Sequence, residues 1–111
     1  MMSDLTIEQI MTNTPKVFKP EAAEGVNTVV QFNFTGAEVS EWVVTIQDGT
    51  CTSEKGTAPS PNMTMTIDSQ DYIDIISGKQ NAMTAFMQGK VKVSGDMMMA
   101  MKFPTFFEMR N

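Results

Sequence analysis

The sequence contains no histidine and only one cysteine, Cys51, among its 111 residues. Histidine is the most common general base and metal ligand, so its absence excludes Ser-His-Asp and Cys-His catalytic arrangements. One cysteine cannot form an internal disulfide and cannot supply a zinc site of the usual type. Because no partner base accompanies Cys51, we expect it to be a small core residue rather than a nucleophile. The sequence therefore predicts a non-enzymatic protein without a cofactor or a metal ion.

Phosphate-binding glycine loops and an excess of positive charge are also lacking. Neither GxxxxGK[ST] nor GxGxxG occurs in the chain. The formal net charge of −5 argues against a nucleic-acid partner, whose binding surface would be basic. The same charge disfavours strong attraction to an anionic bilayer, although a local basic patch would permit transient membrane contact.

No apolar run in the sequence is long enough to span a bilayer. The first residues lack the basic segment and apolar block of a signal peptide, and residues 109–111 do not resemble the Ser-Lys-Leu peroxisomal address. Together with the lone cysteine, these features lead us to expect a cytoplasmic protein. The length predicts one domain over residues 1–111, and we expect a monomer with a dimer as the alternative.

Methionine is the residue that the sequence has in excess, with 12 copies. Its unbranched, polarizable side chain fills irregular apolar space and adapts to ligands of varied shape. Many copies fall within residues 96–109, which are almost entirely apolar, and Pro104 should end or kink this helix near Phe103. A helix that is apolar on most sides must be buried or must bury something. We expect one face on a sheet and another toward a ligand, a membrane or a partner; the alternative is a tightly packed core helix.

The first 25 residues predict a helical arm. A helix is expected over residues 3–14, capped by Ser3 or by a capping box of Thr6 and Gln9. Pro15 favours a second short helical turn after it. We expect Val17 and Phe18 to anchor this arm to the body of the domain.

Residues 26–111 predict a sheet with covering helices. Alternating apolar residues predict strands over 26–34, 39–47, 50–54, 62–67 and 90–94, the first three forming a meander. Helices are expected over 69–77, 82–88 and 96–109, which gives an α+β domain. Asp68, Asp71 and Asp74 recur at helical spacing, which fits a solvated helix face or, alternatively, a weak cation site.

Residues 78–96 resemble the sterol carrier protein type 2 family of small lipid-binding domains. The matching motifs, in order, are Gly78-Lys79, Ala85-Phe86-Met87, Gly89-Lys90-Val91-Lys92-Val93 and Gly95-Asp96. Residues 63–77 are similar to the family's strand that runs into a capped helix, and weaker matches extend back to about Val26. The resemblance implies a five-stranded, mostly antiparallel sheet covered by helices and enclosing an apolar tunnel.

The resemblance further implies a non-catalytic protein that holds a fatty acid, acyl chain, phospholipid or sterol-like molecule in that tunnel. Methionines in the tunnel wall would favour broad selectivity. The proposed lining residues are Phe32, Phe34, Trp42, Val44, Met65, Tyr72, Ile76 and Phe86, with Met98, Met101 and Phe106 as a pliable lid from the C-terminal helix.

Two other functions stay open at this point. The apolar C-terminal helix would also suit a protein-interaction module that docks on a partner without any lipid. Alternatively, the domain would present a lipid substrate to a separate enzyme. Lys79, Lys90 and Lys92 fit either the attraction of lipid headgroups or a solvated strand at the edge of the sheet.

Overall fold

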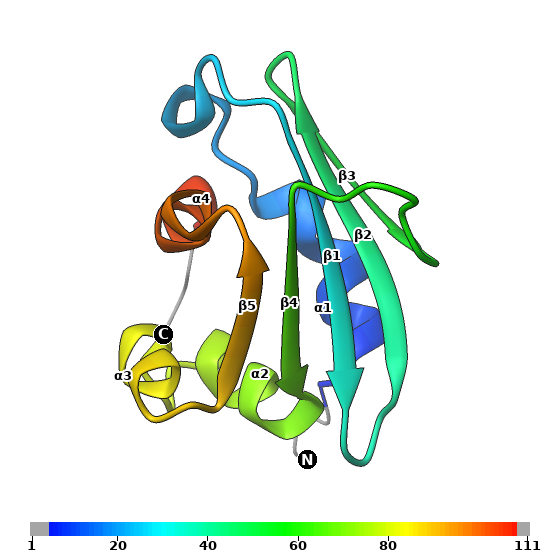
Figure 1. Cartoon of the computed structure of the whole chain (residues 1–111), viewed down its shortest axis with the longest axis vertical. Coiled ribbons are helices and arrows are strands. Elements are labelled where there is room, and N and C mark those ends of the chain that lie inside the picture. Colours follow the sequence, from blue (N-terminus) through cyan, green and yellow to red (C-terminus); the bar gives the residue numbers. More distant parts are fainter. Residues whose placement is uncertain (1–4, 109–111) are drawn as a thin grey trace.

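The computed structural model describes residues 5–108 of the chain. Strands and short helices follow one another in the order that the sequence predicts (Figure 1). The elements are α1 (Ile7–Asn13), η1 (Thr14–Val17), η2 (Pro20–Ala23), β1 (Thr28–Thr35), β2 (Ser40–Gln47), β3 (Thr50–Lys55), β4 (Met63–Asp68), α2 (Ser69–Ile76), α3 (Ala82–Met87), β5 (Val91–Gly95), α4 (Met97–Lys102) and η3 (Phe103–Phe106), where η marks a 3₁₀ turn.

The strands form one five-stranded sheet in the order β3-β2-β1-β4-β5. β1 pairs in parallel with β4, whereas the other neighbouring strands are antiparallel. The segment between β3 and β4 returns across the sheet, so β4 joins the edge of β1 that the meander leaves free. The predicted α+β class and the mostly antiparallel sheet are therefore confirmed.

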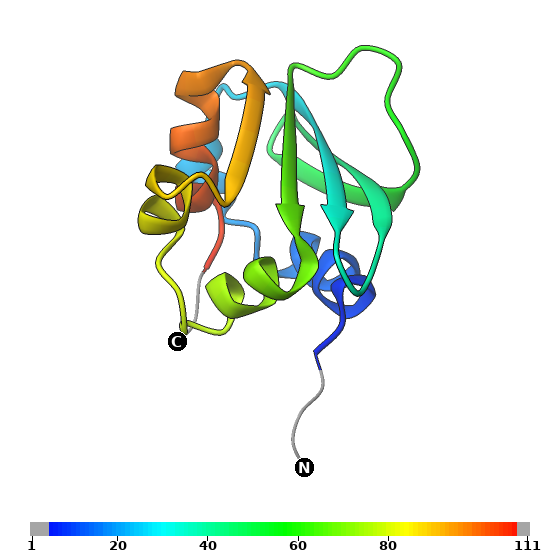
Figure 2. The same cartoon turned by 60° about the horizontal axis from the view of Figure 1, so that its bottom comes forward.

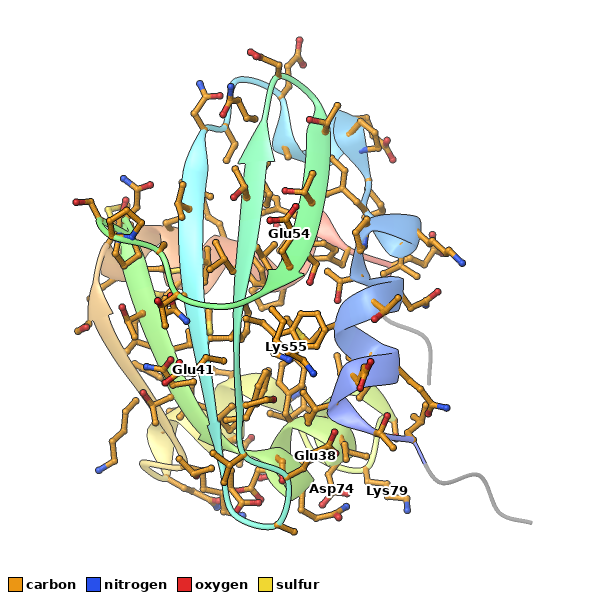
Figure 3. The ribbon with its side chains drawn as sticks, turned by 90° about the vertical axis from the view of Figure 1, so that its right-hand side faces the viewer. Glu38, Glu41, Glu54, Lys55, Asp74 and Lys79 are labelled. Carbon is orange, nitrogen blue, oxygen red and sulfur yellow. The ribbon has the colours of Figure 1, made fainter. Side chains whose placement is uncertain are left out.

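One face of the sheet carries the large apolar side chains. Val30, Phe32 and Phe34 of β1 and Val44 of β2 are at most 2% exposed. α1 and α2 lie against this face, as two perpendicular views show (Figures 1 and 3). The predicted alternation is correct here, because a shift of one residue would have turned Gln31 inward in place of Phe32.

Gln31 is nevertheless buried, on the opposite face of the sheet. Its Nε2 donates hydrogen bonds to the carbonyl oxygens of Trp42 (3.3 Å) and Gly56 (3.2 Å), and its Oε1 accepts the Ala58 N–H (2.7 Å). These bonds satisfy a buried amide and hold the loop that connects β3 to β4 over the sheet.

α1 begins later than the sequence predicts. The capping box of Thr6 and Gln9 is confirmed, while Ser3 lies outside the described residues. The carboxylate of Glu38, beside the start of the helix in Figure 3, accepts the Ile7 N–H at 3.0 Å from each oxygen. A charged acceptor at a helix N-terminus satisfies a free N–H group and complements the helix dipole. Glu38 thus joins α1 to the β1–β2 turn.

Residues 17–19, after α1, contact residues 106–108 at the C-terminal end of the described chain. Phe18 and Phe107 form an isolated antiparallel bridge, and their ring centroids lie 5.7 Å apart. The Lys19 N–H donates to the Phe106 carbonyl, and the Glu108 N–H donates to the Val17 carbonyl, both at 2.8 Å. The N-terminal arm is therefore fastened to the C-terminal segment by backbone hydrogen bonds.

The apolar C-terminal helix is shorter than residues 96–109. Asp96 caps α4 by accepting the Met99 N–H at 3.0 Å, and α4 ends at Lys102. The 3₁₀ turn η3 follows, with Pro104 among its first residues, which confirms the predicted break near Phe103. Met109 lies outside the described residues.

Candidate functional site

A cavity of about 650 Å³ lies between the buried face of the sheet and the helices that cover it. Apolar side chains make up most of its wall. From the sheet, the wall takes Phe32, Val44, Met65, Ile67, Val91 and Val93. From the covering elements, it takes Ile10, Met11, Val17, Tyr72, Ile75, Ile76, Ala82, Met83, Phe86, Met97, Ala100, Met101, Phe103, Pro104 and Phe107.

The opening of the cavity is marked by side chains that both line it and reach solvent. Leu5, just before α1, and Gln9 and Asn13 of α1 meet both conditions. Met83 of α3 and Met101 of α4 line the cavity as well, and they are 46% and 59% exposed. The opening is therefore bordered by α1 on one side and by α3 and α4 on the other.

An aromatic cluster includes Phe32, Tyr72 and Phe103 of the wall, with Phe34 packed behind them. The Phe32 ring lies 5.8 Å from that of Tyr72 and 5.6 Å from that of Phe103, measured between centroids. Phe34 stacks on Phe32 at 5.7 Å and contacts Tyr72 at 5.1 Å. Edge-to-face and offset contacts of this kind stabilise ring orientation beyond simple burial. The part of the wall formed by these rings therefore has a defined shape.

Polar groups in the wall are few. Gln9 and Thr14 are already engaged, because Gln9 Oε1 accepts the Thr6 N–H (3.1 Å) and the Thr14 hydroxyl donates to the Ile10 carbonyl (2.8 Å). Burial raises the pKa of the Tyr72 hydroxyl above its usual range, so Tyr72 stays a neutral phenol. Asn13 and Glu108 are the other polar residues in the part of the wall formed by residues 5–108.

The structure brings many of the predicted lining residues together around this cavity. The side chains in its wall are Phe32, Val44, Met65, Tyr72, Ile76, Phe86 and Met101. They come from strands and helices spread over most of the chain.

Two predicted residues from the strands, Phe34 and Trp42, do not line the cavity. Phe34 is buried behind Phe32 and Tyr72. Trp42 is also buried, with Nε1 donating to Ser40 Oγ (3.2 Å) and the Lys55 ammonium 5.5 Å from the ring centroid. Both residues belong to the packed core.

Two predicted lid residues, Met98 and Phe106, are also outside the wall. Met98 is 72% exposed, because it lies on the face of α4 that points away from the cavity. Phe106 is buried against Phe103, with ring centroids 6.3 Å apart. The break at Pro104 turns the chain and places Phe103 and Phe107 in the wall instead.

The N-terminal arm was not predicted to line the cavity, yet Ile10, Met11 and Val17 all do so. The apolar spacing of Ile7, Ile10 and Met11 was the signal available in the sequence, since it marks one buried helix face. Spacing alone does not say what a helix packs against.

Charged groups form no site of their own in the described part of the chain. Within residues 5–108, no group of three or more Asp, Glu, Cys or His side chains could hold a metal ion. Asp68 instead caps α2, accepting the N–H groups of Gln70 (2.8 Å) and Asp71 (3.4 Å). Lys79, Lys90 and Lys92 are exposed outside the cavity wall, with Lys92 on the edge strand β5.

Within residues 5–108, no helix combines the length and apolarity needed to cross a bilayer.

Comparison with known proteins gives a consistent assignment. The family model described as the SCP-2 sterol transfer family matches residues 7–108. Peroxisomal multifunctional enzyme A of Dictyostelium discoideum is 33% identical over 84 residues, which cover 74% of this chain and 19% of that protein. Sterol carrier protein 2 of Gallus gallus is 37% identical over 67 residues, covering 60% of this chain and 12% of that protein. The chain thus spans less than a quarter of the length of these relatives.

A solved structure shares the fold over most of both chains. The solution structure of palmitated SCP2L2 from Aedes aegypti superposes with a TM-score of 0.73 and 27% sequence identity, covering 89% of this chain and 91% of that one. The family expected from residues 78–96 is thereby confirmed, and the chain belongs to the SCP-2 sterol transfer family.

Proposed function

We propose that this domain binds a lipid with the apolar part of the molecule inside the cavity. The observation that carries the proposal is the cavity of about 650 Å³ with its predominantly apolar wall. A cavity of this size and composition is typical of small-molecule sites, and an apolar ligand would remove that wall from water. The palmitated state of the similar Aedes aegypti protein supports a lipid as the occupant.

The expected affinity follows from the hydrophobic effect. Each buried methylene contributes about 0.8 kcal/mol, so a chain of ~12 carbons gains about 10 kcal/mol before the cost of association. A micromolar complex needs about 8 kcal/mol, and part of the gross gain is lost on immobilising the ligand. Burial of an acyl chain is therefore sufficient for useful binding without any covalent step.

The role that we propose is non-catalytic lipid binding and transfer by residues 1–111 acting as one domain. In a longer protein, the same domain would present a lipid to an enzyme, as the multifunctional relative suggests. We propose a monomer in the cytoplasm, a compartment that suits the single free thiol of Cys51.

Transient membrane contact is part of this proposal, through the side of the molecule formed by α3, β5 and α4 (Figure 2). Residues 78–108 contain four lysines and two carboxylates, whereas residues 5–77 contain three lysines and ten carboxylates. The exposed side chains of Met87 and Met98 lie on α3 and α4. Lysine near an anionic leaflet contributes about 1 kcal/mol per residue, so this side would face the membrane.

Native mass spectrometry of the purified protein, followed by organic extraction, tests the proposal directly. We expect an excess mass that matches a lipid, released on extraction and restored by adding a lipid back. A protein that is free of ligand and also fails to bind added long-chain alcohols and fatty acids would contradict lipid binding. A dimer without lipid would instead favour docking between protein surfaces.

A further inference from the structure

The wall of the cavity offers no cation to a ligand. Of the described residues that line it, none is lysine or arginine, and the chain has no histidine. Among residues 5–108, the one charged residue in the wall is Glu108, which is negative and exposed near the opening. An anionic headgroup that entered this cavity would therefore be repelled by Glu108 at the opening and would find no ion-pair partner among the lining residues in the range 5–108.

A wall without a cation weakens the binding of anionic ligands but not of uncharged ones. An ionised carboxylate loses its hydration on entering an apolar site, and without a partner the loss is so large that the group takes up a proton instead. An alcohol or an ester of the same chain length buries the same methylenes and carries no charge. Its polar end needs only one or two hydrogen bonds.

Neutral hydrogen-bonding groups are present where such a ligand would need them. Tyr72 lines the cavity, and no group among residues 5–108 forms a hydrogen bond with its hydroxyl. Its ring is held by Phe32 and Phe34, so the hydroxyl is in a fixed position. A neutral phenol donates to an ester carbonyl or an alcohol oxygen and accepts from an alcohol O–H. The Asn13 side chain adds an amide at the opening.

We propose that the cavity selects uncharged amphiphiles, such as fatty alcohols or acyl esters, over the fatty-acid carboxylate of equal chain length, with Tyr72 as the polar anchor. This inference rests on the proposed lipid binding and narrows it to a ligand class. It also distinguishes this chain from the similar protein that was solved in its palmitated form.

The test compares 1-dodecanol with dodecanoate in competition against a fluorescent lipid, below the aggregation limit of either ligand. At about pH 8, where a carboxylic acid is ionised, we expect the alcohol to bind at least tenfold more tightly. Lowering the pH to about 5 should narrow this gap, because part of the dodecanoate becomes protonated. Equal or tighter binding of dodecanoate at about pH 8 would overturn the selectivity while leaving lipid binding intact. If neither ligand binds, the proposed function fails and this inference fails with it.

Two variants test the residues named. Tyr72→Phe removes only the hydroxyl, and we expect about threefold to tenfold weaker binding of dodecanol with no change for dodecane. Glu108→Gln removes the negative charge at the opening, and we expect it to strengthen dodecanoate binding by a larger factor than dodecanol binding. An unchanged dodecanol affinity in Tyr72→Phe would show that Tyr72 is not the anchor. Unchanged dodecanoate binding in Glu108→Gln would show that its charge does not exclude anions.

Discussion

The two walls of the cavity differ in how they are packed. β1 and β2 supply several fully buried side chains, whereas β5 and α4 have no buried residue and α3 has only Ala85. Segments with few buried apolar contacts open at lower free energy than the core around them. One wall therefore maintains the shape of the cavity, while the other can adapt to a ligand and let it enter.

The composition of the walls follows the same division. The packed wall uses aromatic and branched residues such as Phe32 and Val44, whose preferred rotamers define a shape. The exposed wall uses Met83, Met97 and Met101, which are unbranched and flexible. We call the exposed side, formed by α3, β5 and α4, the methionine wall. Because the packed wall supplies most of the buried contacts, the side chains of the methionine wall can change conformation around a ligand at little cost in stability.

Truncating one aromatic residue in each wall tests the difference in packing with the largest expected effect. We expect Phe32→Ala to lower the free energy of unfolding by about 3–5 kcal/mol, since Phe32 is 1% exposed and contacts three other rings. Phe86→Ala, in half-buried α3, should cost less than about 2 kcal/mol, because it leaves a smaller cavity. Urea denaturation of the ligand-free proteins measures both, and equal losses would contradict the division.

The packed wall is also the part that the sequence predicted best. Alternation along β1 and β2 placed Phe32 and Val44 on the buried face, because the side-chain period of a strand is two residues. The capping box of Thr6 and Gln9 likewise followed from local hydrogen-bonding chemistry. Local signals of this kind do not depend on the rest of the fold, so they can be read from the chain.

The predicted site was less complete, because it depends on which elements meet. Phe34 and Trp42 are apolar and face the same side of the sheet as Phe32, yet they lie beyond the cavity. Val17 lines the cavity only because backbone hydrogen bonds fasten the arm to Phe106 and Glu108. No local pattern encodes such a contact between the ends of the domain.

Amide hydrogen exchange would measure the difference between the walls directly. We expect amides of β5 and α4 to exchange at least about 100-fold faster than those of β1 and β2, because opening of a sparsely packed segment costs less. A bound lipid should slow exchange in the methionine wall far more than in β1. Equal protection of amides from exchange in both walls would contradict the proposal that the methionine wall opens more easily than the packed wall.

Two methionines on α4 form a matched pair that tests which face of this helix binds the ligand. Met101 lines the cavity and Met98 does not, although they are 59% and 72% exposed. We expect Met101→Asp to weaken lipid binding about thirtyfold, the equivalent of ~2 kcal/mol for a polar group in an apolar wall. Met98→Asp should leave binding within about twofold, since surface substitutions have small effects. A fluorescent lipid titration measures both, and equal losses would place the site elsewhere on α4.

A comparison of two thiols outside the cavity wall, Cys51 on β3 and one placed on the exposed face of α4, gives the smallest and most local test. Burial raises the pKa of Cys51 in β3 from its ordinary 9.0 to about 11, and the thiolate is the reactive form. At about pH 8 we expect a thiol reagent to modify Cys51 at least tenfold more slowly than the exposed thiol of Met98→Cys made in a Cys51→Ser background. Chemical unfolding should remove the difference. Because the pKa is raised on folding, the contribution of Cys51 to stability is retained below pH 9 and declines as the pH approaches 11. Equal rates at about pH 8 in the folded proteins would mean that β3 is no better protected than the exposed face of α4.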